Sequence, residues 1–112
     1  MALIRTSGKS SVLPDGVNAL TTIYQNNSAI SGSHNFTLSK KSLVIVAGGS
    51  NAGTCTFNID DGTYTYSTPS ANTQGSCAFV LDAGEHTVAC SHTNHPSGTY
   101  WSSGIVAYTE IE

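Results

Sequence analysis

Apolar residues recur at every second position over several stretches of this chain, a period that fits a β-strand rather than a helix. His34, Phe36 and Leu38 share one face of a predicted strand over residues 33–39, with Ser, Asn and Thr between them. Residues 54–59 repeat the pattern, because Cys55, Phe57 and Ile59 alternate there with polar residues. No stretch shows convincing helical spacing at i, i+3 and i+4. The alternation therefore predicts an all-β chain.

Residues 43–47 differ from this pattern, because five apolar residues follow one another there (LVIVA). An uninterrupted apolar run of this length predicts a central strand that is covered on both faces. We expect this strand to stop at the Gly-rich run 48–53, which predicts a flexible turn.

The pair Asp61-Gly62 predicts a hairpin, because a type I′ turn needs positive φ at both central positions. With those two residues as the loop, Phe57 lies opposite Tyr66 and Ile59 opposite Tyr64. This register places apolar and aromatic side chains on one face, and a slip of one residue would destroy that match.

A second hairpin is predicted with its turn at Ala83-Gly84. The same counting places three pairs of residues opposite each other: Leu81 with His86, Phe79 with Val88, and Cys77 with Cys90. Apolar residues again gather on one face.

A further strand is predicted over 105–111, a weaker one over 17–24, and a short one near Val12-Leu13. Seven or eight short strands at about ten-residue spacing predict an antiparallel β-sandwich or jelly roll. We expect residues 1–16 to form an N-terminal arm or edge segment and residues 17–112 a single sandwich domain.

Charge is scarce in this chain of 112 residues, since 10% are charged and the formal net charge is −3. An average globular protein has about 25% charged residues. The four cations, Arg5, Lys9, Lys40 and Lys41, form no basic stripe, which argues against nucleic acid as a partner. No apolar run is long enough to span a membrane or to act as a signal peptide. We therefore expect neither nucleic acid nor membrane as a partner. We also expect the chain to be made in the cytoplasm, without a signal peptide.

The three cysteines allow two interpretations. Cys77 and Cys90 lie opposite each other in the predicted second hairpin, where a disulfide is geometrically possible. Cys55 is then left over, and the odd number without a signal peptide favours reduced thiols in the core.

Signals for catalysis and metal binding are weak. Cys90, His92 and His95 fall within six residues, but without the paired spacing typical of zinc sites. The acids Asp60, Asp61, Asp82 and Glu85 are explained by turn chemistry. There is no Gly-x-Ser-x-Gly nucleophile motif. We expect no metal, no cofactor and no enzymatic activity.

The segment 92–101 joins two predicted strands and contains the only Trp. Aromatic faces with nearby amide and imidazole groups are the ingredients of a sugar site. Asn94, His95, Tyr100 and Trp101 are therefore candidate ligand contacts. The competing interpretation places Trp101 at the start of the last strand, as a cap on the core.

Two segments resemble known virion proteins. The run Phe79–Val88 (FVLDAGEHTV) is similar to a hairpin of carbohydrate-binding β-sandwiches and phage fibre heads, and the end Ser102–Ile111 (SSGIVAYTEI) resembles the closing strand of small phage virion domains. The size and the composition rich in Ser, Thr and Gly are also similar to small accessory proteins of tailed-phage virions, such as decoration proteins, fibre knobs and tail adaptors. The resemblance implies a multimeric, usually trimeric, structural role.

These features lead to two functional hypotheses. The first is a non-enzymatic virion surface protein that self-assembles, with the trimer favoured, and docks on a larger scaffold protein through the segment Ala2–Ser11. The second is a carbohydrate-binding module that uses the 92–101 segment to bind a glycan.

Overall fold

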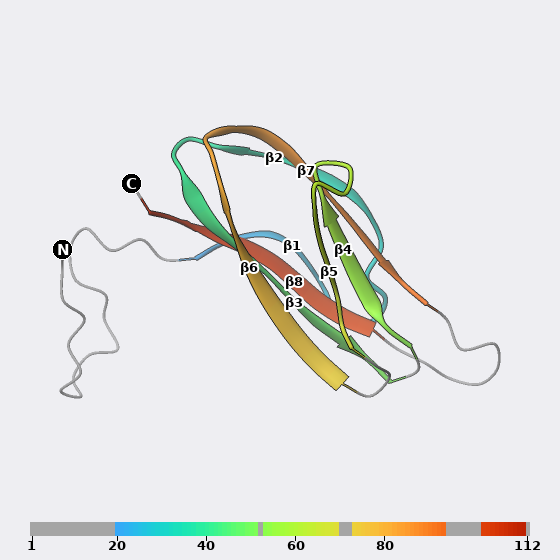
Figure 1. Ribbon diagram of the computed structural model, residues 1–112. Coiled ribbons are helices and arrows are strands. Elements are labelled where there is room, and N and C mark those ends of the chain that lie inside the picture. The colour runs from blue at the N-terminus through green and yellow to red at the C-terminus, as the bar shows by residue number, and fades with distance from the viewer. Residues whose placement is uncertain (1–19, 52, 70–72, 94–101, 112) are drawn as a thin grey trace, which may run out of the picture.

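The computed structural model describes residues 20–51, 53–69, 73–93 and 102–111. Eight antiparallel strands form two sheets that pack as a β-sandwich (Figure 1). The strands are β1 (Thr21–Asn26), β2 (Gly32–Leu38), β3 (Ser42–Ser50), β4 (Cys55–Ile59), β5 (Tyr64–Ser67), β6 (Thr73–Leu81), β7 (Gly84–His92) and β8 (Ser102–Glu110). The predicted all-β fold class is confirmed, and no helix occurs in the described ranges. The predicted arm, residues 1–16, and the short strand near Val12-Leu13 lie outside those ranges.

The strand order is that of a jelly roll. The first sheet, here called sheet A, has the order β1-β8-β3-β6, and the second, sheet B, has the order β2-β7-β4-β5. The first strand thus pairs with the last, the second with the seventh, and so on inward to the hairpin β4–β5. This nested pairing rolls the chain into two sheets that share one core.

The residues predicted to point inward from sheet B do so. Cys55, Phe57 and Ile59 are fully buried, and Leu38 is nearly so. Val44 and Val46 of β3 meet them from sheet A. The period-two pattern therefore identified the core-facing side of these strands correctly.

The first predicted hairpin is confirmed in type and in register. Phe57 pairs with Tyr66 and Ile59 with Tyr64. Asp61 and Gly62 both have positive φ (56° and 90°), and the Thr63 N–H donates to the Asp60 carbonyl at 3.2 Å. These values match the type I′ turn that the Asp-Gly pair predicts.

The second predicted hairpin is wrong, because β6 and β7 belong to different sheets. Phe79 pairs with Val44 and Cys77 with Val46 in sheet A, whereas Val88 pairs with His34 and Ile59 in sheet B. Asp82 and Ala83 carry the chain from one layer to the other. Of the two residues expected to form the turn, only Gly84 has positive φ, so the type I′ geometry is not formed.

The expected turn at 48–53 begins later than predicted, because β3 continues through Gly48 and Gly49 to Ser50. Gly48 lies above the ring of Phe57 and against the backbone of β8. A Cβ atom at Gly48 would lie 3.1 Å from Phe57 Cζ and 2.8 Å from the Ser103 carbonyl oxygen. The glycine thus permits close packing inside a strand rather than ending it.

Candidate functional site

The four residues proposed as ligand contacts, Asn94, His95, Tyr100 and Trp101, lie outside the described ranges. The 92–101 segment joins β7 of sheet B to β8 of sheet A.

The three cysteines are free thiols. Cys77 lies on β6 in sheet A and Cys90 on β7 in sheet B, so the register that suggested a bridge between them does not exist. Burial and the nearby Cys55 raise the pKa of Cys90 to about 11. Burial also raises the pKa of Cys55, although its thiol donates to the Gly49 carbonyl at 3.3 Å. At neutral pH both thiols are therefore protonated and weakly nucleophilic.

The outer face of sheet B is largely polar, and several of its side chains are paired with one another. Hydrogen bonds of 2.9 Å join side chains of adjacent strands: Thr56 with Ser67, Thr65 with Asn58, and Thr87 with Asn35. Short hydroxyl and amide side chains that are paired in this way suit a face exposed to water.

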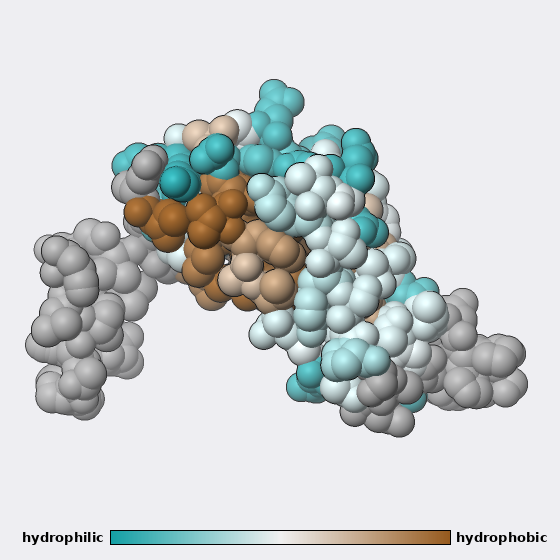
Figure 2. Space-filling view, in the orientation of Figure 1, coloured by the Kyte–Doolittle hydropathy of each residue, from teal (hydrophilic) through white to brown (hydrophobic). Residues whose placement is uncertain are grey.

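The outer face of sheet A is different, because its outward positions on β3, β6 and β8 are largely apolar. These positions follow from the strand register, since their neighbours Val44, Val46 and Val106 are fully buried in the core. Seven residues form what we call the outer apolar face: Leu43, Ile45, Ala47, Ala78, Val80, Ile105 and Ala107. Figure 2 shows hydrophobic atoms gathered over the upper part of β6 and giving way to paler atoms towards its lower end.

Part of this face is open to solvent in the single chain. Val80 is 48% exposed, Ala78 is exposed, and Leu43 and Ile45 are half-buried. The run 43–47 predicted a strand covered on both faces, yet this chain covers only the inner one with its second sheet. Contiguous apolar surface of this kind marks interaction sites on soluble proteins.

Charge is distributed unevenly between the two ends of the sandwich. The seven charged residues in the described ranges all lie at the end that holds the β2–β3, β4–β5 and β6–β7 connections and the end of β8: Lys40, Lys41, Asp60, Asp61, Asp82, Glu85 and Glu110. We call this the charged end. The opposite end, where β1, β3 and β7 finish, has no charged side chain among the residues described, and we call it the uncharged end.

A compact polar cluster at the charged end fastens the β4–β5 hairpin to β7. Asp60 Oδ2 lies 2.7 Å from His86 Nδ1, and Asp60 Oδ1 accepts from the Thr87 N–H at 3.1 Å. The other ring nitrogen, His86 Nε2, lies 2.8 Å from the Asp82 carbonyl oxygen. A carboxylate and a carbonyl only accept hydrogen bonds, so both ring nitrogens donate only when the imidazole is protonated.

The pKa of His86 reflects this arrangement. Burial lowers the pKa, but the hydrogen bonds to Asp60 and to the Asp82 carbonyl, together with the charges of Asp60 and Asp82, more than offset it. The pKa of His86 is therefore raised above its ordinary value. The ring also stacks on Phe36, with 5.5 Å between centroids. The cluster therefore has a structural role, because its hydrogen bonds join the β4–β5 hairpin to β7.

The described residues form neither a metal-binding cluster nor a membrane-spanning helix. No set of three His, Cys, Asp or Glu side chains among them is placed to hold a metal ion. None of the described segments is a helix long and apolar enough to cross a membrane.

No protein-family model, no curated protein and no solved structure matches this chain. Among the described residues, the outer apolar face of sheet A combines contiguous apolar side chains with partial exposure to solvent.

Proposed function

We propose that this chain is a non-enzymatic assembly protein that buries the outer apolar face of sheet A against further copies of itself. The observation that carries the proposal is the apolar face on β3, β6 and β8, which the described residues leave partly open to solvent, beside a largely polar outer face on sheet B with several paired side chains. Removing apolar surface from water contributes about 25 cal/mol per Å². Sheets that pack face to face lie about 10 Å apart with interdigitated side chains, which is the contact this face offers.

The absence of charge on this face favours a second copy as the occupant. Near the axis of a symmetric oligomer, two-fold or three-fold, a side chain meets its own copies, so a charged side chain there meets its own like charge. No outward-facing residue of β3, β6 or β8 is charged. The outer apolar faces of different copies can therefore meet without bringing like charges together. The charged side chains at one end of the sandwich remain in water.

The setting proposed for this assembly is a tailed-phage virion, with docking on a larger scaffold protein. Its support is the resemblance of Ser102–Ile111 to the closing strand of small virion domains, together with the jelly-roll strand order; Phe79–Val88, which resembles a hairpin in sequence, crosses between the sheets and gives no such support. Jelly rolls occur in viral capsid and lectin domains, although a fold alone does not define a function. The resemblance favours a homotrimer, and the scaffold contact is assigned to Ala2–Ser11. Deleting Ala2–Ser11 should abolish attachment to the scaffold while the oligomer persists, and full attachment of the truncated chain would contradict that assignment.

A pair of matched substitutions tests self-assembly. Ala78→Asp places a charge on the outer face of sheet A, and Ala89→Asp places the same charge on the outer face of sheet B, at a position beside Ser33 and Asn58. Light scattering should give a multiple of the 11.6 kDa chain mass for the wild type and for Ala89→Asp, and the monomer mass for Ala78→Asp. Circular dichroism checks that both variants fold. A monomeric wild type at micromolar concentration, or an oligomer that survives Ala78→Asp, would overturn the proposal.

A further inference from the structure

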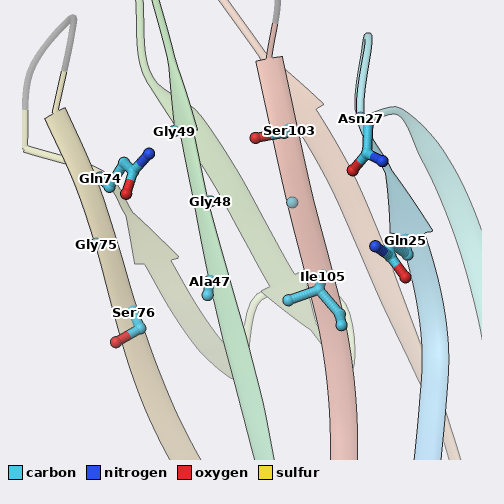
Figure 3. A pocket seen from close by; sticks show the side chains of 11 residues that line it. Gln25, Asn27, Ala47, Gly48, Gly49, Gln74, Gly75, Ser76, Ser103 and Ile105 are labelled. Carbon is cyan, nitrogen blue, oxygen red and sulfur yellow. The ribbon is translucent and has the colours of Figure 1, made fainter.

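A shallow groove of about 530 Å³ crosses the outer surface of sheet A near the uncharged end, next to the outer apolar face (Figure 3). Strands β6, β3 and β8 form its floor, and the end of β1 with Asn27 forms one side. Its volume lies within the range of about 300–1,000 Å³ that is common for small-molecule sites.

Backbone forms much of the floor of the groove. Gly48, Gly75 and Gly104 are inward-facing positions, so they show only backbone on the outer surface, and their lack of a Cβ leaves room for the core side chains beneath. A Cβ at Gly104 would lie 3.1 Å from Phe57 Cζ, and one at Gly75 would overlap the hydroxyl of Tyr66. Gly49 faces outward and leaves a gap beside Gln74. The result is a flat strip of peptide backbone, with Ala47 and Ile105 at the border with the outer apolar face.

Neutral polar side chains surround this floor. The polar residues that line the groove are Gln25, Asn27, Gln74, Ser76 and Ser103. In Figure 3 the amides of Gln25 and Asn27 project from the β1 side, and Gln74 projects from β6 across the floor. None of these five side chains makes a hydrogen bond to another residue in the described ranges. The amides of the sheet B face, by contrast, are paired with neighbouring hydroxyls.

From this arrangement we infer that the groove binds a neutral saccharide. A carboxamide offers both a donor and an acceptor, which matches two adjacent hydroxyl groups of a sugar ring. A flat floor bordered by Ala47 and Ile105 suits the C–H face of a pyranose. The lining contains no cation to hold a phosphate or carboxylate, and the described lysines lie at the other end of the sandwich.

This site goes beyond the proposed function and differs from the 92–101 segment that the sequence suggested. Its residues come from β1, β3, β6 and β8, with Asn27 beyond the end of β1. A single chain supplies all of them, and two, Ala47 and Ile105, also belong to the outer apolar face, so a monomer presents the whole groove to a ligand.

The test uses the full chain and a glycan array of uncharged oligosaccharides, followed by calorimetric titration with the best-bound trisaccharide. Gln74→Ala and Gln25→Ala should each weaken binding by about tenfold, since a lost hydrogen bond is worth about 1 kcal/mol. Asn35→Ala, which removes an amide from the outer face of sheet B, is the matched control and should leave the affinity unchanged. Circular dichroism confirms the fold of each variant.

Two further measurements separate this site from the alternatives. The Ala78→Asp variant should bind the saccharide at least as tightly as the wild type, because a monomer leaves Ala47 and Ile105 uncovered, so failure of the assembly proposal and failure of the groove proposal are distinguishable. Trp101→Ala should also retain binding. Absence of binding to any uncharged saccharide on the array would overturn the inference. So would binding that survives Gln25→Ala and Gln74→Ala together.

Discussion

The two outer faces of this sandwich are built from the same strand geometry but have opposite chemistry. On sheet B, hydroxyls and amides of adjacent strands pair with each other, as Thr56 does with Ser67. On sheet A, the equivalent positions hold Ile45 beside Ala78 and Leu43 beside Val80. A face whose polar groups are paired loses little by staying in water, whereas an apolar face gains free energy when it is covered. The difference is the basis of our proposal that sheet A, and not sheet B, makes the contact between copies.

The substitution with the largest expected effect tests whether sheet A and sheet B share one cooperative core. Phe57 reaches from sheet B to Gly48 and Gly104 of sheet A and is fully buried. Phe57→Ala should lower the free energy of unfolding by about 3–5 kcal/mol, through lost burial and the cavity left behind. Urea denaturation followed by circular dichroism measures the loss.

The control for that change is Phe57→Leu, which keeps part of the volume and should cost clearly less. Hydrogen exchange should show both sheets of the Leu variant opening with one free energy. If sheet A and sheet B open independently, they do not share one core in the way that the position of Phe57 indicates.

A smaller effect is expected from pH, and it should come from the charged end. Because the pKa of His86 is raised in the folded state, its contribution is complete below the ordinary histidine pKa of about 6.5 and is lost as the pH rises through the folded pKa. We expect the stability of the protein to fall on this account as the pH rises above about 6.5 and through the folded pKa, as the charge-assisted bond to Asp60 disappears. Denaturation series at several pH values measure the trend.

Asp60→Asn is the variant that isolates this contribution. Asn tolerates the positive φ of Asp60 (54°) and keeps an acceptor for the Thr87 N–H, but it removes the negative charge. The pH dependence should become flatter in this variant. The control Asp61→Asn changes the adjacent exposed carboxylate and should leave the dependence as it is in the wild type; equal flattening by both would show that general charge, not the Asp60–His86 contact, is responsible.

The smallest expected effect compares equivalent exchanges on the two faces. Thr56→Val removes one exposed hydrogen bond from sheet B and should change stability by no more than about 0.5 kcal/mol. Ile45→Thr on sheet A should move the concentration at which the oligomer dissociates upward by about tenfold or more, because it places a hydroxyl in the buried contact. Dilution series in analytical ultracentrifugation measure the concentration at which each variant dissociates. If both variants dissociate at the same concentration, the two faces do not differ in their contribution to the oligomer.

Local signals in the sequence predicted much of the fold. Alternation identified the inward residues of β2 and β4, and the Asp61-Gly62 pair identified the β4–β5 hairpin with its register. Both signals depend on residues that are close in the chain. The β6–β7 prediction failed because alternating apolar residues look the same whether two strands lie side by side or face each other across the core.

The surface sites were harder to predict for the same reason. The run 43–47 indicated a strand apolar on both faces, but Ala78 and Val80 become its outer neighbours only through the pairing of β3 with β6. The groove likewise combines Gln25, Gln74 and Ser103 from three strands distant in sequence. Gly48 and Gly49 predict a turn when they are considered alone, but glycines within a strand also mark close approach of backbone and side chain.

The pairing of β1 with β8 has a consequence for how the protein is made. β1 ends at Asn26 and β8 begins at Ser102, and β8 is the only strand of its sheet that β1 contacts through hydrogen bonds. During synthesis β1 must wait unpaired until β8 has left the ribosome, while the β4–β5 hairpin can close early from local contacts. The edge of β1 is therefore exposed while residues 27–101 and β8 are synthesised, a period in which chaperones or neighbouring nascent copies have access to it.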